Sequence, residues 1–258
     1  MRSTRRPRRP RIRKQSDETW KDPVGAPAPR HLLSAGLRID RFRAVAFDLD
    51  GTLVDSAPDL AAAANAMLAS LGHRPLAQER VAAAIGDGIE ALVARTLEES
   101  MGAAPDREAL GDAASLFREI YLGRVFEAST IFEGVREGLE ALSRRGVPLG
   151  VVTNKAAPFT RALLERSGLS RWLSFVECAD AIEQRKPAPF LLLKACEDLR
   201  IEPRQLLFVG DSALDVAAAR AAGSPVVLVD YGYNKGRPAR DAGADAVIAS
   251  LVQLDATA

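Results

Sequence analysis

After residue 132 the chain alternates between short apolar segments and segments with helical spacing, and this alternation most restricts its possible fold. The apolar segments are PLGVVTN (148–154), SFVECAD (174–180), QLLFVGD (205–211), PVVLVD (225–230) and ADAVIAS (244–250). The helical segments are REGLEALSRRG, APFTRALLERSG, APFLLLKACEDLR and SALDVAAARAAG. Apolar strands that alternate with helices favour a parallel sheet covered on both faces. The pattern therefore predicts an α/β fold with a doubly wound, Rossmann-like parallel sheet.

One strand of this sheet is separated from the others in the sequence. RAVAFDLD (43–50) is a short apolar segment that ends in acids, whereas residues 57–132 contain no strand pattern. Helical segments fill that stretch, and in the first of them apolar residues recur at helical spacing from Leu60 to Leu71. The sequence thus predicts a core domain of residues 42–56 and 133–258, with an all-helical domain inserted at 57–132.

Polar residues follow several of the predicted strands at the point where each strand ends. In a doubly wound sheet, ligands bind beyond the carboxyl ends of the strands, so these residues form a candidate site. A loop before a later helix adds a lysine and a proline. The candidates are Asp48, Asp50, Thr153, Asn154, Lys186, Asp211 and Asp215.

The types of these residues suit phosphoryl chemistry. Asp48, Asp211 and Asp215 offer only oxygen ligands, the kind that Mg²⁺ prefers. Lys186 supplies a positive charge for a phosphate, and Thr153 and Asn154 supply hydrogen bonds. A carboxylate can attack phosphorus, and a neighbour two residues away on the same side of the chain can transfer the proton.

Two further polar residues of the same segment have simpler interpretations. Asp55 is expected to support a turn or the start of a helix, and not to bind a ligand. Ser56 precedes an Ala-rich helical segment and is expected to cap it with its side chain.

Charge is unevenly distributed along the chain. Residues 1–43 hold 13 Lys or Arg against 4 Asp or Glu, and the rest holds 22 against 30. Residues 1–41 are rich in arginine and interrupted by proline, so we expect a disordered basic arm that binds anions weakly. The acidic remainder is not typical of a nucleic-acid-binding protein, and we expect no specific nucleic acid partner.

No segment reaches the roughly 18 apolar residues that a membrane span requires. No apolar segment of the kind found in secretory signals follows the arginines of the arm. The two cysteines, Cys178 and Cys196, lie far apart and form no zinc motif. We therefore expect a cytoplasmic protein with no membrane partner.

Four segments in order, FDLDGTLVDS, VVTN, KPAP and VGDSALDVAAARAAG, resemble the haloacid dehalogenase superfamily of phosphohydrolases. The resemblance implies that Asp48 is the nucleophile and Asp50 the general acid/base. It implies phosphate binding by Thr153 and Lys186. It further implies Mg²⁺ held by Asp48, the Asp50 backbone carbonyl and Asp211, with Asp215 acting through water or as an outer ligand. The inserted helices resemble the cap domain of that superfamily, which closes over the site.

Three further segments resemble the bacterial phosphoglycolate phosphatases: DGTLVDSAPDLAAAANAML, IGDGIEALVARTL and YGYNKGRPARDAGADAVIASL. This resemblance implies hydrolysis of 2-phosphoglycolate through an aspartyl-phosphate, with Arg95 in the cap as a candidate partner of the substrate carboxylate. The alternative is that Arg95 is a solvated helix residue or one that pairs with Glu98 or Glu99. The chain departs from many relatives at Leu214, Lys235 and Phe190.

Other functions remain open at this point. A phosphatase or phosphomutase acting on another small phosphate ester, such as a sugar phosphate, fits the same motifs. A non-catalytic binding protein on this fold is a remote alternative, because such proteins typically lose the nucleophile or a metal carboxylate. We expect the partner to be a small phosphorylated metabolite and the protein to be a monomer or homodimer.

Overall fold

The computed structural model describes residues 39–179 and 181–255. Its largest element is a parallel sheet of six strands in the order β5-β4-β1-β6-β7-β8. The strands are β1 (Ala44–Phe47), β4 (Leu149–Thr153), β5 (Phe175–Cys178), β6 (Leu206–Gly210), β7 (Val226–Val229) and β8 (Ala246–Ile248). These are the six strands expected from the sequence, and the predicted doubly wound α/β fold is confirmed.

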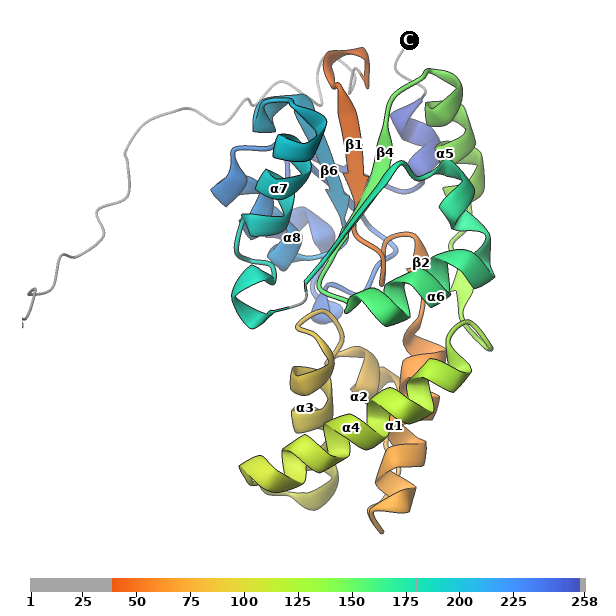
Figure 1. Ribbon diagram of the computed structural model, residues 1–258, viewed down its shortest axis with the longest axis vertical. Coiled ribbons are helices and arrows are strands. Elements are labelled where there is room, and N and C mark those ends of the chain that lie inside the picture. Colours follow the sequence, from red (N-terminus) through yellow and green to blue (C-terminus); the bar gives the residue numbers. More distant parts are fainter. Residues whose placement is uncertain (1–38, 180, 256–258) are drawn as a thin grey trace, which may run out of the picture.

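Helices cover both faces of the sheet (Figure 1). On one face lie α5 (Val135–Arg144) and α6 (Ala157–Ser167), and on the other α7 (Phe190–Leu199) and α8 (Ala213–Ala222). Alternate residues of β1 serve the two faces: Val45 and Phe47 enter one hydrophobic cluster, and Ala44 and Ala46 the other. All four are fully buried, as expected for a central strand of a parallel sheet.

Four helices lie beyond one end of the sheet (Figure 1). They are α1 (Ala57–Ser70), α2 (Gln78–Ala82), α3 (Ile89–Met101) and α4 (Arg107–Arg124), and we call them the cap helices. All four lie within residues 57–132, where the sequence predicts an all-helical domain. α4 stops at Arg124, and Phe126 has a φ of 63°. There the backbone N–H groups of residues 127–129 donate to Asp59 instead of continuing the helix.

Two short strands that the sequence did not predict join the sheet to the cap helices. β2 (Val54–Asp55) and β3 (Thr130–Ile131) pair antiparallel, with Val54 opposite Ile131. Strands of two residues are too short to produce an alternating pattern. Because β2 precedes α1 and β3 follows α4, the chain enters and leaves the cap helices side by side.

The boundary of the predicted basic arm needs a correction. Ile39–Arg41 form a short 3₁₀-helix, and Ile39 is fully buried in the core. The expected disorder is therefore wrong at these three residues, because an apolar side chain anchors them. The remainder of the arm lies outside the described residues. Across the part of the chain that the structure describes, no helix has both the length and the apolar character needed to cross a bilayer.

Candidate active site

The central strand carries the first site residue to the end of the sheet that faces the cap helices. Asp48 directly follows β1, and its backbone N–H donates to the carbonyl of Val209 in β6 at 2.8 Å. The chain then turns at Gly51, which has a φ of +92°. A Cβ atom at Gly51 would lie 2.6 Å from Oδ2 of Asp211. Glycine thus allows the turn after β1 to lie directly against the end of β6.

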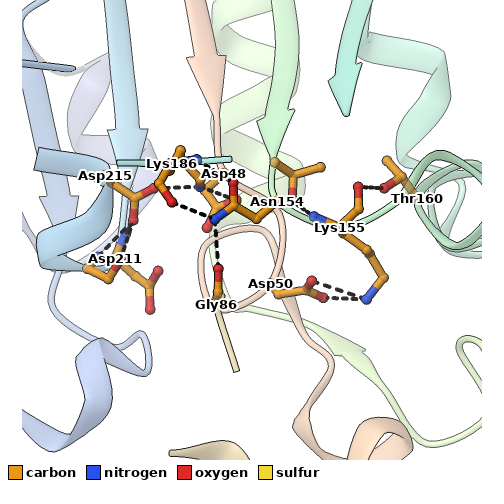
Figure 2. Close-up of polar contacts among 11 residues, drawn as sticks. Asp48, Asp50, Gly86, Asn154, Lys155, Thr160, Lys186, Asp211 and Asp215 are labelled. Carbon is orange, nitrogen blue, oxygen red and sulfur yellow. Dashed lines mark hydrogen bonds and ion pairs between the residues drawn. The ribbon is translucent and has the colours of Figure 1, made fainter. Parts of the chain in front are cut away.

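Three carboxylates and a lysine meet at this end of the sheet (Figure 2). One oxygen each of Asp48, Asp211 and Asp215 lies within 4.8 Å of the others, and all three residues are buried. The Lys186 Nζ lies 2.8 Å from Oδ1 of Asp48 and 2.6 Å from Oδ1 of Asp215. We call these four residues the acidic cluster. The structure thus brings together residues that are up to 167 positions apart in the sequence.

Asp215 differs from the other two carboxylates because both of its oxygens are occupied by protein donors. Oδ1 accepts from Lys186, and Oδ2 accepts from the backbone N–H of Asp211 and Ser212 and from the Ser212 hydroxyl. A Cβ atom at Gly210 would lie 2.4 Å from Cγ of Asp215, so only glycine fits there. This arrangement suits an outer position better than direct contact with a cation.

Burial makes the acidic cluster electrostatically costly. It raises the pKa of Asp48 to about 6, with Lys186 acting in the opposite direction and Asp215 in the same direction. Burial raises the pKa of Asp211 to about 8, and the charges of Asp215 and Asp48 add to the effect. Burial lowers the pKa of Lys186, but Asp215 and Asp48 outweigh it, so the net shift is upward. One lysine facing three buried carboxylates leaves an excess of negative charge, and the all-oxygen donor set suits a hard divalent cation.

A second group of charges lies on the other side of Asp48. The Lys155 Nζ lies 2.9 and 3.1 Å from the two carboxylate oxygens of Asp50. It also lies 4.8 Å from the ring centroid of Tyr121, which comes from α4 in the cap. We call Asp50, Lys155 and Tyr121 the Lys155 cluster. Its lysine is only 7% exposed.

Neither Lys155 nor Tyr121 was predicted from the sequence as a site residue. Lys155 immediately follows Asn154 at the end of β4, so the rule that identified Thr153 and Asn154 could also have identified it. Tyr121 gave no such signal, because an aromatic residue on a helix predicts a core position.

Thr153 and Asn154 both line the cavity between the sheet and the cap helices, but their side chains make different hydrogen bonds. The Thr153 Oγ1 accepts from the backbone N–H of Lys155 at 3.1 Å. The Asn154 amide donates to the carbonyls of Gly86 and Lys186, and its Oδ1 accepts from the backbone N–H of Lys186. Asn154 therefore connects the loop that carries Lys186 to the loop after α2 (Figure 2).

A small cavity of about 40 Å³ lies between the sheet and the cap helices. Its polar lining comes mainly from the core, including Asp48, Asp50, Thr153 and Lys186. Its apolar lining comes from the cap residues Leu60, Ile85, Ile89 and Leu92. A second cavity of about 20 Å³ shares Asp48, Asp50 and Lys186 and reaches Leu214 and Lys235. Leu214 and Lys235, two of the three positions at which the chain departs from many relatives, thus lie beside the site.

The structure does not place Arg95 in the lining of either cavity. Its Nη2 lies 2.5 Å from Oδ2 of Asp87, and its side chain is 46% exposed. The alternative pairing with Glu98 or Glu99 is not present either. Lys235 of the core also pairs with Asp87 at 2.8 Å, and Arg185 pairs with Glu90 of α3 at 2.7 Å. Asp87 and Glu90 thus connect the cap to the core.

Asp55, the last residue of β2, and Ser56, which follows it, behave differently from each other. Oδ1 of Asp55 accepts from the backbone N–H of Ala57 and from the Tyr233 hydroxyl, as expected for a turn acid. Ser56 stands at the N-cap position of α1, but its side chain makes no capping bond. The expected capping is wrong, because the Ser56 hydroxyl donates to Oδ1 of Asp50 at 2.5 Å. The serine therefore helps to orient Asp50.

Comparison with known proteins adds to this geometry. Residues 45–229 match the family model described as haloacid dehalogenase-like hydrolase. Phosphoglycolate phosphatase from Nitrosospira multiformis is 45% identical over 82% of this chain and 93% of that protein. A plasmid-encoded phosphoglycolate phosphatase from Cupriavidus necator is 48% identical over 83% of this chain and 91% of that protein. The crystal structure of a predicted phosphoglycolate phosphatase from Haemophilus somnus has a TM-score of 0.79 and 30% identity, covering 83% of this chain and 96% of that one.

Proposed function

The chain belongs to the haloacid dehalogenase-like hydrolases, and from this premise we propose that it is a phosphatase that hydrolyses 2-phosphoglycolate to glycolate and phosphate. One observation carries the proposal: Asp48 and Asp50 border the same small cavity between the sheet and the cap helices, with Lys186 beside the first. The relatives at 45% and 48% identity are phosphoglycolate phosphatases, which supports the choice of substrate.

Asp48 is assigned as the nucleophile. Its carboxylate attacks phosphorus, the bond between phosphorus and the ester oxygen breaks, and an aspartyl-phosphate forms on Asp48. Asp50 donates a proton to the departing glycolate oxygen. Asp50 then takes a proton from water, whose oxygen attacks phosphorus and releases phosphate and the free Asp48 carboxylate. Ser56 and Lys155 hold the Asp50 carboxylate in place for both steps.

The acidic cluster fits Mg²⁺, with Asp48, the Asp50 backbone carbonyl and Asp211 as its proposed ligands and Asp215 as an outer partner. When bound, the ion supplies positive charge that stabilises the charge developing on the phosphoryl group. Lys186 binds a phosphate oxygen while its pairing with Asp215 holds the ammonium in place. Thr153 donates its hydroxyl to another phosphate oxygen. Asn154 is assigned to positioning Lys186, because its amide is already bonded to the Lys186 backbone.

The cap helices are proposed to close over the substrate and exclude water. A cavity of about 40 Å³ supports a small substrate, since it holds only a few water-sized groups. The two free cysteines fit a reducing compartment, and we propose that the enzyme acts in the cytoplasm.

A panel of phosphate esters tests the proposal. Phosphate release with Mg²⁺ is measured for 2-phosphoglycolate, sugar phosphates and nucleoside monophosphates, and 2-phosphoglycolate is expected to have the highest kcat/KM. Equal rates across the panel would overturn the substrate but not the phosphatase. Isomerised product without free phosphate would identify a mutase. Asp48→Asn, which removes the proposed nucleophile, is expected to lose phosphate release from every ester of the panel. Asp112→Asn, on the exposed surface of α4, is the control for this variant.

A further inference from the structure

Two lysines line the cavity between the core and the cap, and they are committed to different partners. Lys186 contacts Asp48 and Asp215, on the side of the cavity where the phosphate is proposed to bind. Lys155 contacts Asp50 and the Tyr121 ring. An ammonium has three N–H donors, and Asp50 uses at most two of them through its two oxygens. At least one donor of Lys155 is therefore not used by Asp50, and among the described residues Tyr121 is the other side chain with which this ammonium interacts.

The Tyr121 hydroxyl supplies a second polar group at the same place. Tyr121 is fully buried, lines the cavity, and its hydroxyl makes no hydrogen bond with any described residue. Burial raises its pKa to about 12, so the hydroxyl remains a neutral donor at physiological pH. A buried hydroxyl without a partner is unfavourable, and such groups in native proteins call for an explanation. An acceptor on a bound ligand would remove the cost.

The other side chains on the cap side of the cavity offer little to an anion. Leu60, Ile85, Ile89 and Leu92 are apolar, and Arg95 is held outside by Asp87. Asn154 is bonded to the backbone on both sides of its amide. Among the side chains of the described residues that line this cavity, those of Lys155 and Tyr121 thus remain to recognise a second anionic group on a phosphate ester.

We infer that Lys155 and Tyr121 form the subsite for the carboxylate of the substrate and so determine specificity for phosphorylated acids. The inference rests on the proposed function, in which Asp50 contacts the ester oxygen. In 2-phosphoglycolate a single methylene separates that oxygen from the carboxylate, so the carboxylate must lie close to Asp50. The Lys155 Nζ already lies 2.9 Å from Asp50, and Tyr121 adjoins it. The cap thereby contributes a substrate-binding group through α4.

Matched substrate pairs test this subsite. Each pair differs only in the carboxylate: 2-phosphoglycolate with 2-hydroxyethyl phosphate, and 3-phosphoglycerate with glycerol 3-phosphate. The selectivity is the kcat/KM of the acid divided by that of its partner. Because a hydrogen bond to a charged group is lost, Tyr121→Phe is expected to lower this selectivity about 10-fold, and Lys155→Met about 100-fold. Tyr231→Phe removes a hydroxyl that bonds to Thr52 outside the cavity, and it is expected to leave the selectivity unchanged.

The outcomes separate this inference from the proposed function. If Tyr121→Phe slows both members of each pair equally, the residue is structural and the subsite is wrong. A wild-type enzyme with no preference for acids in either pair would also overturn the subsite. A preference for acids in both pairs without a preference for 2-phosphoglycolate would keep the subsite and reject the proposed substrate. Because the Tyr121 hydroxyl has no partner, the thermal stability of Tyr121→Phe is expected to equal or exceed that of the wild type, which checks that it folds.

Discussion

The acidic cluster and the Lys155 cluster each contain a buried lysine paired with an aspartate of the FDLD segment, yet they differ in origin. The acidic cluster lies entirely on the core, at the ends of β1 and β6 and on the loop and helix next to them. The Lys155 cluster combines the core with α4 of the cap. The proposed nucleophile and metal site thus lie on the core alone, whereas the proposed carboxylate subsite lies where the core meets the cap. This separation predicts that changes in the acidic cluster or at Asp50 affect all substrates alike, whereas a change at Tyr121 affects carboxylate-bearing substrates most.

The largest expected effect comes from the acidic cluster. Asp48→Asn removes the proposed nucleophile, and kcat is expected to fall by about 10⁴-fold or more for every phosphate ester. Phosphate release from both members of a matched substrate pair measures it, with Asp112→Asn as the control. A loss confined to carboxylate-bearing substrates would mean that the two clusters do not divide the work in this way.

All four residues of the acidic cluster could be predicted from the sequence, whereas one of the three residues of the Lys155 cluster, Tyr121, could not. Asp48 and Asp211 follow apolar strands directly, and the carboxyl ends of neighbouring parallel strands meet at one edge. Tyr121 is different, because only the packing of α4 against the core turns a helical aromatic residue into part of the cavity. Arg95 shows the reverse case. Its position in the cap sequence suggested that it binds the carboxylate of the substrate, but in the structure it pairs with the carboxylate of Asp87 and lies outside the cavity.

The next largest effect is expected at Asp211, where a substitution should lower the activity but raise the stability of the protein without metal. Asp211→Asn is expected to reduce activity by about 10³-fold through loss of a proposed Mg²⁺ ligand. The same change removes a buried charge, so in EDTA at pH 8 the variant is expected to be more stable than the wild type by more than about 1 kcal/mol. Thermal unfolding and activity are measured on the same samples. A variant less stable than the wild type in EDTA would show that the protein accommodates this charge without a cation.

The pH dependence of stability sharpens the comparison further. The folded pKa values of Asp48 and Asp211, about 6 and about 8, lie above the ordinary value. The folded state therefore holds protons that the unfolded state has released, and the free energy of unfolding falls as pH rises from about 4 to 8. Mg²⁺ offsets this loss, so its effect on Tm is expected to be greater at pH 8 than at pH 6. An equal effect at both values would contradict the raised pKa of Asp211.

The smallest expected effect concerns the contacts that hold the cap over the Lys155 cluster. Lys235 and Arg95 together outweigh partial burial and lower the pKa of Asp87, so this carboxylate stays ionised and bridges cap and core. Partly exposed ion pairs contribute about 0–1 kcal/mol, so Lys235→Ala is expected to raise KM by about 5-fold at most.

Removing this pair weakens closure but leaves every group of the acidic cluster in place, so kcat is expected to change less than KM. Added salt screens the pair, and the difference between Lys235→Ala and the wild type is expected to shrink as ionic strength rises. Arg240→Ala, which removes an exposed charge whose nearest carboxylate lies 3.9 Å away, is the control. A lower kcat with unchanged KM would instead place Lys235 with the chemistry, because the loop that carries it also supplies the Tyr233 and Asn234 N–H groups that bond Asp211.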